Sequence, residues 1–247
     1  MTDTATLSKP ALNVRISTPP GAPLPYINSK VLEVRNMKYL MQAMGWRIYP
    51  MLEGGHLHYF KNLGCLNDRR LHDAEVLVAA CCGSPKTLLE IGTNKGHATA
   101  LMARNAPEGT VYTVNIPPEE IEEGGRLTTC APSCEEIGSY YRERGLTNIR
   151  QILANTTTWE PHIGTIDVAF IDGCHDAEFV YNDTRKILRH CRSGSLILWH
   201  DFNPSLVKVY KVIGEVCRGI NQLYVDGLLK DFILHLQDSF MGLYRVP

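Results

Sequence analysis

The chain has 247 residues, with 25 lysines and arginines against 26 aspartates and glutamates, so its net charge is −1 when histidines are neutral. This balance argues against a protein that holds nucleic acid mainly through phosphates. Apolar residues make up 44% of the chain, which is enough for one large domain or one domain with an appendage.

The apolar runs and the cysteines restrict where the protein works. The longest apolar runs, such as Val76–Cys82, are too short to cross a bilayer, and the first ten residues lack the apolar core of a secretory signal. Eight cysteines occur without a CxxC pair, so we expect free thiols in a reducing cytoplasm, with a Cys130–Cys134 disulfide as the less favoured alternative. We expect a cytoplasmic protein without nucleic-acid or membrane partners, and a homo-oligomer stays open.

The first 69 residues differ in composition and apolar pattern from the rest of the chain. Residues 1–28 are rich in proline, threonine and serine and predict an extended or flexible arm. Apolar spacing predicts a helix from Asn28 or Ser29 to about Met44. We interpret residues 29–69 as a helical or mixed lid, in which Trp46, Tyr49 and Tyr59 would line a substrate pocket.

From residue 70 onward, apolar strands alternate with helical segments. After a helix over Leu71–Cys82, the strands are expected at Thr87–Ile91, Thr110–Asn115, Ile149–Leu153, Ile166–Ile171 and Ser195–Trp199. The helices are expected at His97–Asn105, Cys134–Arg144, Ala177–His190 and Leu206–Cys217. Two further strands, Asn221–Val225 and Ser239–Arg245, would form an antiparallel hairpin at the sheet edge.

This alternation predicts an α/β, Rossmann-like fold. The sheet would be mainly parallel and seven-stranded, with helices on both faces and the antiparallel C-terminal hairpin at one edge. Ligands of such sheets bind beyond the carboxyl ends of the strands, so the residues that follow each strand are the candidates for function.

A glycine turn follows the first of these strands in the stretch Glu90-Ile91-Gly92-Thr93-Asn94-Lys95-Gly96. Gly92 permits a tight turn, Gly96 permits close approach of a ligand, and the helix start favours a negative group. The spacing Gly-x-x-x-Gly does not meet the dinucleotide fingerprint. Glu90 would repel a pyrophosphate and attract an ammonium or sulfonium ligand. A purely structural turn with Glu90 as a capping acid is the alternative.

Polar residues also follow the later strands. Asn115 can hydrogen-bond a ribose diol, and Asn155 and Thr156 stand where an adenine edge would lie. The densest group comes from two apolar strands that each end in a carboxylate, with histidines close by: Asp172, His175, His200 and Asp201. Such a group can hold a hard divalent cation or supply a general base. Helix caps and solvated polar residues are the alternative. His56 and His58 have ligand-like spacing but no third partner, which favours a surface or pocket-lining role.

Four motifs in order carry a resemblance: Leu88–Gly96, Val111–Glu119, Phe170–His175 and Trp199–Phe202. Over residues 70–247 the chain resembles the class I S-adenosylmethionine-dependent methyltransferases. It is most similar to their small-molecule branch with an IDG-x-H and an HD motif, which includes metal-dependent sugar O-methyltransferases. The resemblance implies a methyltransferase that acts on a small molecule at a hydroxyl oxygen.

The resemblance also implies roles for individual residues. Glu90, Gly92, Thr93 and Gly96 would hold the methionine part of S-adenosylmethionine, with Asn115 at the ribose, Asn155 and Thr156 at the adenine, and Asp172 beside the cofactor amine. Asp172 and Asp201 would hold Mg²⁺ or another divalent cation, and Asp172, His175 and His200 would be catalytic. Relatives carry aspartate where Asn115 stands and Gly-Asp where Ala154-Asn155 stand, so two carboxylates are lost here. A nicotinamide-dependent oxidoreductase, a catalytically silent binding protein and a non-methylating enzyme such as a cyclase remain the alternatives.

Overall fold

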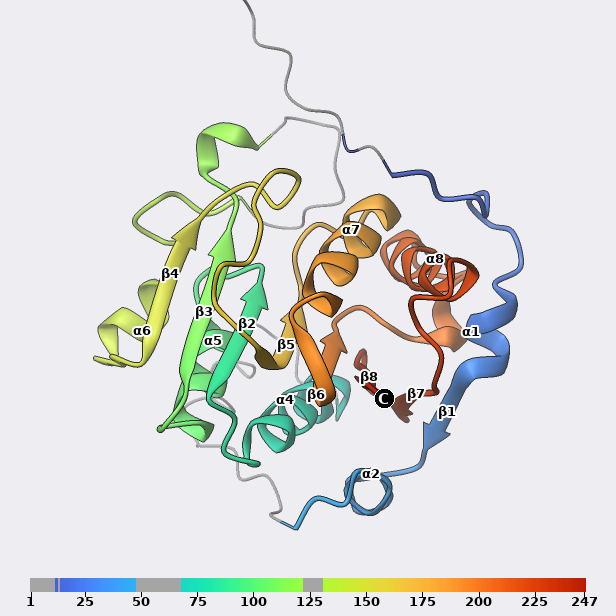
Figure 1. The fold of residues 1–247 in the computed structure, drawn as a ribbon, viewed down its shortest axis with the longest axis horizontal. Helices are drawn as coiled ribbons and strands as arrows, with labels where there is room; N and C mark the ends of the chain where they lie inside the picture. The colour runs from blue at the N-terminus through green and yellow to red at the C-terminus, as the bar shows by residue number, and fades with distance from the viewer. Residues whose placement is uncertain (1–11, 13, 48–67, 122–130) are drawn as a thin grey trace, which may run out of the picture.

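A computed structural model describes residues 12, 14–47, 68–121 and 131–247 (Figure 1). Its strands are β1 (Val31–Val34), β2 (Thr87–Ile91), β3 (Thr110–Asn115), β4 (Ile149–Leu153), β5 (Ile166–Ile171), β6 (Cys191–Trp199), β7 (Ile233–Leu236) and β8 (Gly242–Arg245). Its α-helices are α1 (Pro25–Lys30), α2 (Met37–Met44), α4 (Asp68–Cys81), α5 (His97–Asn105), α6 (Ser139–Glu143), α7 (Ala177–Leu188) and α8 (Lys211–Val225). Two short 3₁₀ turns, η1 and η2, cover Pro118–Glu120 and Pro204–Leu206.

All eight strands form one sheet in the order β1-β7-β8-β6-β5-β2-β3-β4. Neighbours are parallel except β8, which runs antiparallel to both β6 and β7. This confirms the predicted Rossmann-like class and the antiparallel C-terminal hairpin. The sheet has one strand more than predicted, because β1 pairs with β7 and lies outside the hairpin.

Helices cover both faces of the sheet, so each central strand buries side chains in two directions. On one face Leu88 packs in a cluster with residues of α2, α4, α5 and α6. On the other face Leu89 packs with residues of α1, α7 and α8. Both leucines are fully buried, and each contributes about 1.5–3 kcal/mol of transfer free energy. The near-continuous apolar strands of the sequence have this physical cause.

The helix predicted from Asn28 or Ser29 to Met44 is wrong in its first half. The chain forms α1, then strand β1, and only then α2. The side chain of Asn36 caps α2 by accepting from the amide of Tyr39, and Gly45 ends the helix with φ +65°. Residues 31–34 become a strand because they pair in register with Ile233–Leu236.

The strand predicted at Asn221–Val225 is also wrong, since these residues form the last turns of α8. Ile220 and Leu223 are fully buried against the sheet, so the helical apolar face outweighs the local strand preference. The missing hairpin partner is β7. Of the predicted helix Cys134–Arg144 only Ser139–Glu143 is helical, and the helix expected at Leu206 begins at Lys211.

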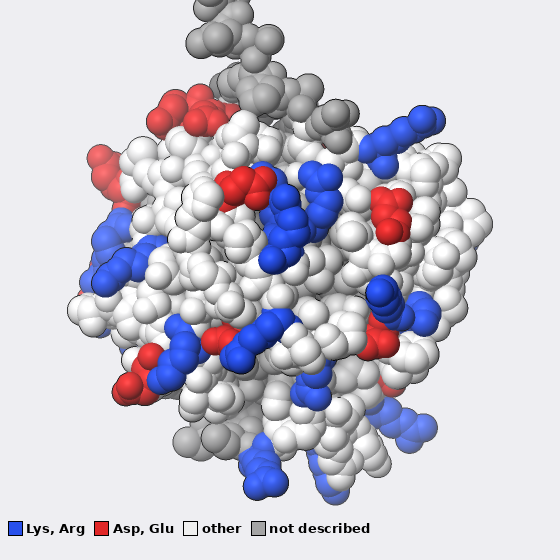
Figure 2. All heavy atoms as spheres, viewed as in Figure 1, with Lys and Arg blue, Asp and Glu red and all other residues white. Residues whose placement is uncertain are grey.

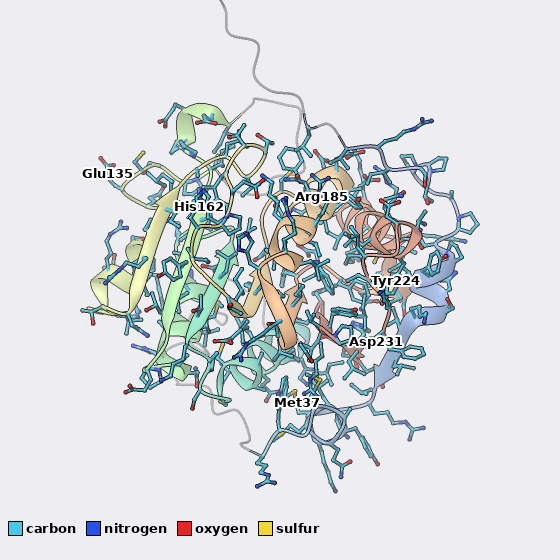
Figure 3. The ribbon with its side chains drawn as sticks, viewed as in Figure 1. Met37, Glu135, His162, Arg185, Tyr224 and Asp231 are labelled. Carbon is cyan, nitrogen blue, oxygen red and sulfur yellow. The ribbon has the colours of Figure 1, made fainter. Side chains whose placement is uncertain are left out.

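The segment before β1 lies against α8. Ser17 donates from its amide and its hydroxyl to the side-chain oxygen of Gln222, at 2.8 and 2.7 Å. Tyr26 stacks on Tyr224 of α8 with ring centroids 5.6 Å apart, and Tyr224 in turn donates to the carbonyl of Asp231 (Figure 3). These contacts attach residues 17–26 to the domain.

Several predictions fall on residues outside the described ones. These are the histidine pair His56 and His58, the aromatic residues Tyr49 and Tyr59, and Cys130 of the suggested disulfide. The six cysteines in the described ranges are all free thiols. Over those same residues, no helix has both the length and the apolar character needed to cross a bilayer.

Candidate functional site

The turn after β2 brings the ends of β2 and β5 into contact. Gly92 has φ +101°, and its amide donates to the carbonyl of Val114 at 2.8 Å. A Cβ atom on Gly92 would lie 2.0 Å from the carbonyl oxygen of Asp172. A Cβ on Gly96, which has φ +86° and precedes α5, would lie 2.5 Å from the ring of Tyr141. Both predicted glycines are therefore required by packing and backbone conformation.

Glu90 is fully buried at the end of β2. Its Oε2 atom accepts hydrogen bonds from the hydroxyls of Thr99 and Thr113. Among the described residues, its Oε1 atom has no hydrogen-bond partner. Burial raises the pKa of the carboxyl to about 8, although the two threonine hydroxyls oppose this shift. Glu90 thus offers one unsatisfied oxygen to a hydrogen-bond donor.

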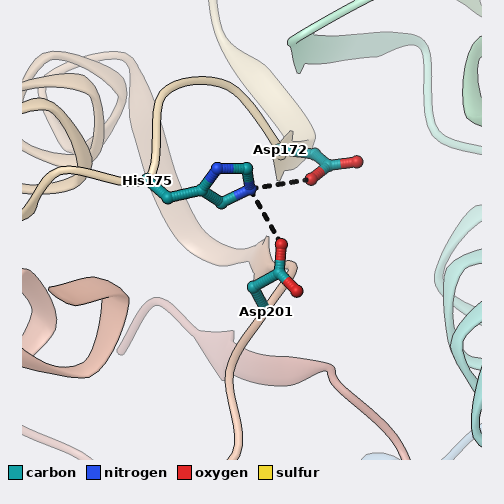
Figure 4. Close-up of side chains that lie close together, drawn as sticks. All are labelled: Asp172, His175 and Asp201. Carbon is teal, nitrogen blue, oxygen red and sulfur yellow. Dashed lines mark ion pairs between the residues drawn. The ribbon is translucent and has the colours of Figure 1, made fainter. Parts of the chain in front are cut away.

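Two strand ends bring Asp172, His175 and Asp201 together (Figure 4). The Nε2 atom of His175 lies 2.8 Å from Oδ2 of Asp201 and 3.8 Å from Oδ1 of Asp172. His200 contacts the same two carboxylates from its Nδ1 atom, at 3.2 Å from Asp172 and 3.3 Å from Asp201. Asp201 adopts φ +52°, a conformation that aspartate tolerates better than most residues. We call Asp172, His175, His200 and Asp201 the rim cluster.

The charges of the rim cluster shift the pKa values of its members in opposite directions. Burial alone would lower the pKa of His175, but the hydrogen bonds that its imidazole donates to the carboxylates of Asp172 and Asp201 raise it to about 10. The same two carboxylates raise the pKa of His200 well above its usual value against the effect of burial. The pKa values of Asp172 and Asp201 are lowered, because the histidines outweigh desolvation. In the ligand-free protein the two imidazoliums therefore compensate the carboxylates.

The rim cluster also contains a candidate cation site. Among the described residues, ligand atoms of Asp172, His175 and Asp201 lie within 4.8 Å of one another. Two carboxylate oxygens and one imidazole form a donor set that suits divalent cations. The chemistry of the donors therefore fits the predicted metal at Asp172 and Asp201, and it adds His175 to the set.

Asp73 on α4 is a polar residue of the site that the sequence analysis missed. Its Oδ1 atom accepts from the amide of Phe240 at 2.6 Å, and its Oδ2 atom lies 3.4 Å from Nε2 of His200. Asp73 is buried, so its charge acts on His200 with little screening. The signal in the sequence was an acid on the apolar side of a helix, next to Ala74 and before Leu77.

A cavity of about 190 Å³ connects the glycine turn with the rim cluster. Five of the predicted cofactor residues line it: Glu90, Gly92, Thr93, Gly96 and Asp172. His200 lines it as well, together with Asp73 and apolar side chains that include Leu101, Phe170 and Met241. His175 and Asp201 do not line this cavity but contact its wall through Asp172 and His200. One space therefore joins the acid before the turn to the end of β5.

Three other predicted residues lie outside the cavity, at the ends of β3 and β4. Asn115 accepts from the amide of Asn94 at 3.0 Å and donates to the carbonyl of Ile116 at 2.9 Å. Asn155 donates to Glu120 and accepts from Thr157. The carbonyl of Thr156 accepts from the buried Lys186 at 2.7 Å. Both asparagine side chains thus shape the loops in which they stand.

The chain is similar to known methyltransferases in sequence and in fold. Residues 89–202 match a family model described as a methyltransferase domain. No curated protein matches the chain. Among solved structures, the O-methyltransferase NovP superposes with a TM-score of 0.53 at 17% identity, over 71% of this chain and 78% of that one.

Two further structures extend the likeness over more of the chain. An O-methyltransferase described as putative, from Klebsiella pneumoniae, gives a TM-score of 0.53 at 17% identity, over 85% of this chain and 94% of its own. The O-methyltransferase TomG from Streptomyces achromogenes, solved with SAM, gives 0.52 at 15% identity, over 83% and 92%. At such identities these likenesses establish the fold.

Proposed function

We propose that this chain, whose residues 89–202 form a methyltransferase domain, moves a methyl group from S-adenosylmethionine to a hydroxyl oxygen of a small molecule. The observation that carries this proposal is the single cavity that joins Glu90, the glycine turn and the rim cluster. The structural neighbours NovP and TomG are O-methyltransferases, which supports oxygen as the methyl acceptor.

The cavity residues fit the methionine part of S-adenosylmethionine. The unpartnered Oε1 atom of the buried Glu90 suits an ammonium group, because a buried carboxylate oxygen without a donor costs free energy. Lys95 and the amino end of α5 line the same cavity and favour a carboxylate. The ammonium group of the methionine part would thus face Glu90, and its carboxylate would face Lys95 and the amino end of α5.

We assign the nucleoside part to the ends of β3 and β4. Asn115 would face the ribose, and Asn155 with Thr156 would lie at the adenine. The support for this assignment is the strand order, because β3 and β4 follow β2 on the side away from β5. Main-chain groups of the two loops would then make more of the contacts with the nucleoside than the asparagine side chains, since these side chains already have internal partners.

The rim cluster would prepare the acceptor hydroxyl. S-adenosylmethionine supplies a methyl group activated by a positively charged sulfur when it is bound. The protein aligns the acceptor in a cavity with apolar walls, which excludes water from the reaction. Asp172 and His200 line this cavity and would flank the hydroxyl that loses its proton, and His175 contacts Asp172 from outside the cavity.

A divalent cation such as Mg²⁺ fits the same account. Asp172, His175 and Asp201 would hold it. A cation at this place stabilises a deprotonated hydroxyl. With the carboxylate charges shared with such a cation, His200 would be held less strongly in its protonated form, could release that proton to solvent, and could then accept the proton of the hydroxyl. We therefore favour metal-assisted O-methylation over the metal-free route.

The charges on one face of the molecule bear on the kind of partner. Lysine and arginine side chains are interspersed with acidic ones on the face shown in Figure 2, so this face offers no uniform basic surface for nucleic acid. We also propose a cytoplasmic location, which the free thiols of the described cysteines support.

Isothermal titration calorimetry tests the proposal directly. We expect the purified protein to bind S-adenosylhomocysteine, the demethylated product, and to show no heat with NAD. Labelled methyl transfer from S-adenosylmethionine to host extracts, read by mass spectrometry, should then yield a methylated small molecule. Binding without any transfer would favour the silent alternative. Binding of NAD alone would overturn the proposal.

A further inference from the structure

The two oxygens of Glu90 have very different surroundings. Oε2 accepts from Thr99 on α5 and from Thr113 on β3, whereas Oε1 has no hydrogen-bond partner among the described residues. The residue is fully buried and lines the cavity. Because Thr99 and Thr113 occupy Oε2, Oε1 is the oxygen that remains available to a ligand.

The hydrogen bond beyond Thr113 has one consistent direction. Thr113 gives its only hydroxyl hydrogen to Glu90, so its oxygen must accept in the 2.7 Å contact with the hydroxyl of Thr93. Thr93 therefore donates to Thr113, which leaves its oxygen available to accept from another group. That group is the side-chain amide of Gln151, whose Nε2 atom lies 3.0 Å from the Thr93 oxygen.

The orientation of Gln151 is fixed by groups that can act in one way only. Its Nε2 atom also faces the main-chain carbonyls of Thr113 and Ile152, at 3.2 and 3.1 Å, and carbonyls only accept. Its Oε1 atom accepts from the hydroxyl of Tyr141 at 2.8 Å. The donors are thus aligned in one direction from Tyr141 to Glu90.

This alignment suits only the ionised form of Glu90. A proton on Oε2 would meet two hydroxyls that already donate there, and a proton on Oε1 would have no acceptor among the described residues. Burial acts in the opposite sense and favours the neutral form. The hydrogen-bonded chain therefore offsets part of the cost of a buried charge.

We propose that Thr99, Thr113, Thr93 and Gln151 are positioning residues that hold Glu90 ionised, with its free oxygen turned toward the ammonium of the bound cofactor. This inference rests on the proposed function and deepens it. Thr99 and Thr113 do not line the cavity and act through Glu90, so their removal should weaken only ligands that carry the ammonium group.

Two ligands separate this role from general damage. S-adenosylhomocysteine carries the amino acid part, and 5′-methylthioadenosine lacks it. In Thr113→Val, the loss of a hydrogen bond to a charged group should weaken S-adenosylhomocysteine about tenfold or more at pH 7 and leave 5′-methylthioadenosine unchanged. Thr113→Ser should restore the affinity. Thr110→Val, at the far end of the same strand, is the matched control and should bind both ligands normally.

The pH dependence gives a second readout. The affinity of the wild type for S-adenosylhomocysteine, relative to 5′-methylthioadenosine, should increase as pH rises toward the raised pKa of Glu90. Thr113→Val should move this increase to higher pH, because fewer donors then stabilise the carboxylate. Thr99→Val removes the other donor and should have the same effect, which keeps the test decisive if one variant does not fold.

The outcomes are distinct. Equal weakening of both ligands, or no weakening of either, in folded Thr113→Val and Thr99→Val would overturn the positioning role while the proposed function stands. A wild-type protein that binds neither ligand would overturn the proposed function and this inference with it.

Discussion

Replacing Gly92 with alanine perturbs the contact between the ends of β2 and β5. The new Cβ atom would lie 2.0 Å from the carbonyl oxygen of Asp172, 2.5 Å from its carbonyl carbon and 2.9 Å from the amide nitrogen of Gly173. All three atoms are main chain, so no side chain can rotate away. The backbone at Gly92 also has φ +101°, which L-residues rarely adopt.

The expected magnitude has two parts. A positive φ costs an alanine about 1–2 kcal/mol. Overpacking against atoms that must shift costs about 1–3 kcal/mol more. Gly227→Ala separates the two, because Gly227 has φ +70° but no atom within 4 Å of the added Cβ. The two variants should thus differ by about 1–3 kcal/mol, or about 2–12 °C in Tm for a chain of this size.

The assay is thermal and urea unfolding of wild type, Gly92→Ala and Gly227→Ala, followed by circular dichroism. The alanine at Gly92 should also weaken S-adenosylhomocysteine, because relief of the overlap must move the carbonyl of Asp172 at the cavity. Gly227→Ala should leave that affinity unchanged. Equal destabilisation by the two substitutions would show that β2 and β5 do not approach each other as described, and our account of the turn would be wrong.

Three further predictions follow from individual contacts. Lys186→Met should lower the free energy of urea unfolding by about 2–5 kcal/mol, since it removes the donor of a buried side chain from the carbonyls of Thr156 and Trp159, whereas Arg189→Met, in an exposed ion pair, should stay within about 1 kcal/mol. Burial opposes ionisation of Asp167, but hydrogen bonds from Arg192 and main-chain amides lower the pKa of its carboxyl. Ionised Asp167 therefore stabilises the folded protein at pH values above the unfolded pKa near 3.8, and this contribution is lost as pH falls through the lowered pKa. Asp167→Asn should accordingly be less stable than wild type at pH 7, with a smaller difference at pH 3. Asp201→Asn should abolish the calorimetric heat of Mn²⁺ binding, whereas Glu119→Gln, which removes an exposed carboxylate, should retain it.

The sequence predicts the parallel half of the fold well, and the reason is local. Strands β2 and β5 are mostly apolar and are each followed within two residues by a glycine, and β3 is rich in valine and threonine, so their positions follow from neighbouring residues alone. Strand β1 cannot be predicted in this way. The spacing of Val31 and Val34 suits a helix as well as a strand, and only pairing with β7 selects the strand.

In the candidate site, too, the sequence predicts some residues and not others. Glu90 and Asp172 stand directly after or at the ends of strands, so topology alone predicts that they approach one cavity. The internal hydrogen bonds of Asn115 depend on the conformation of the turn at Asn94, which its residue type does not reveal. Asp73 reaches the cavity because α4 packs against α5 and β5, a tertiary arrangement without a motif.

The pairing of β1 with β7 has a consequence for biosynthesis. Val31 and Ile233 lie about 200 residues apart in sequence, yet they are neighbours in the sheet. On the ribosome, residues 31–34 emerge about 200 residues before residues 233–236 and cannot pair with them until those residues have been translated. Closure of so long a loop is slow. Until it is complete, the edge of β7 that faces β1 has unpaired main-chain groups. A chaperone that shields this edge would therefore be of most use between the synthesis of β7 and its pairing with β1.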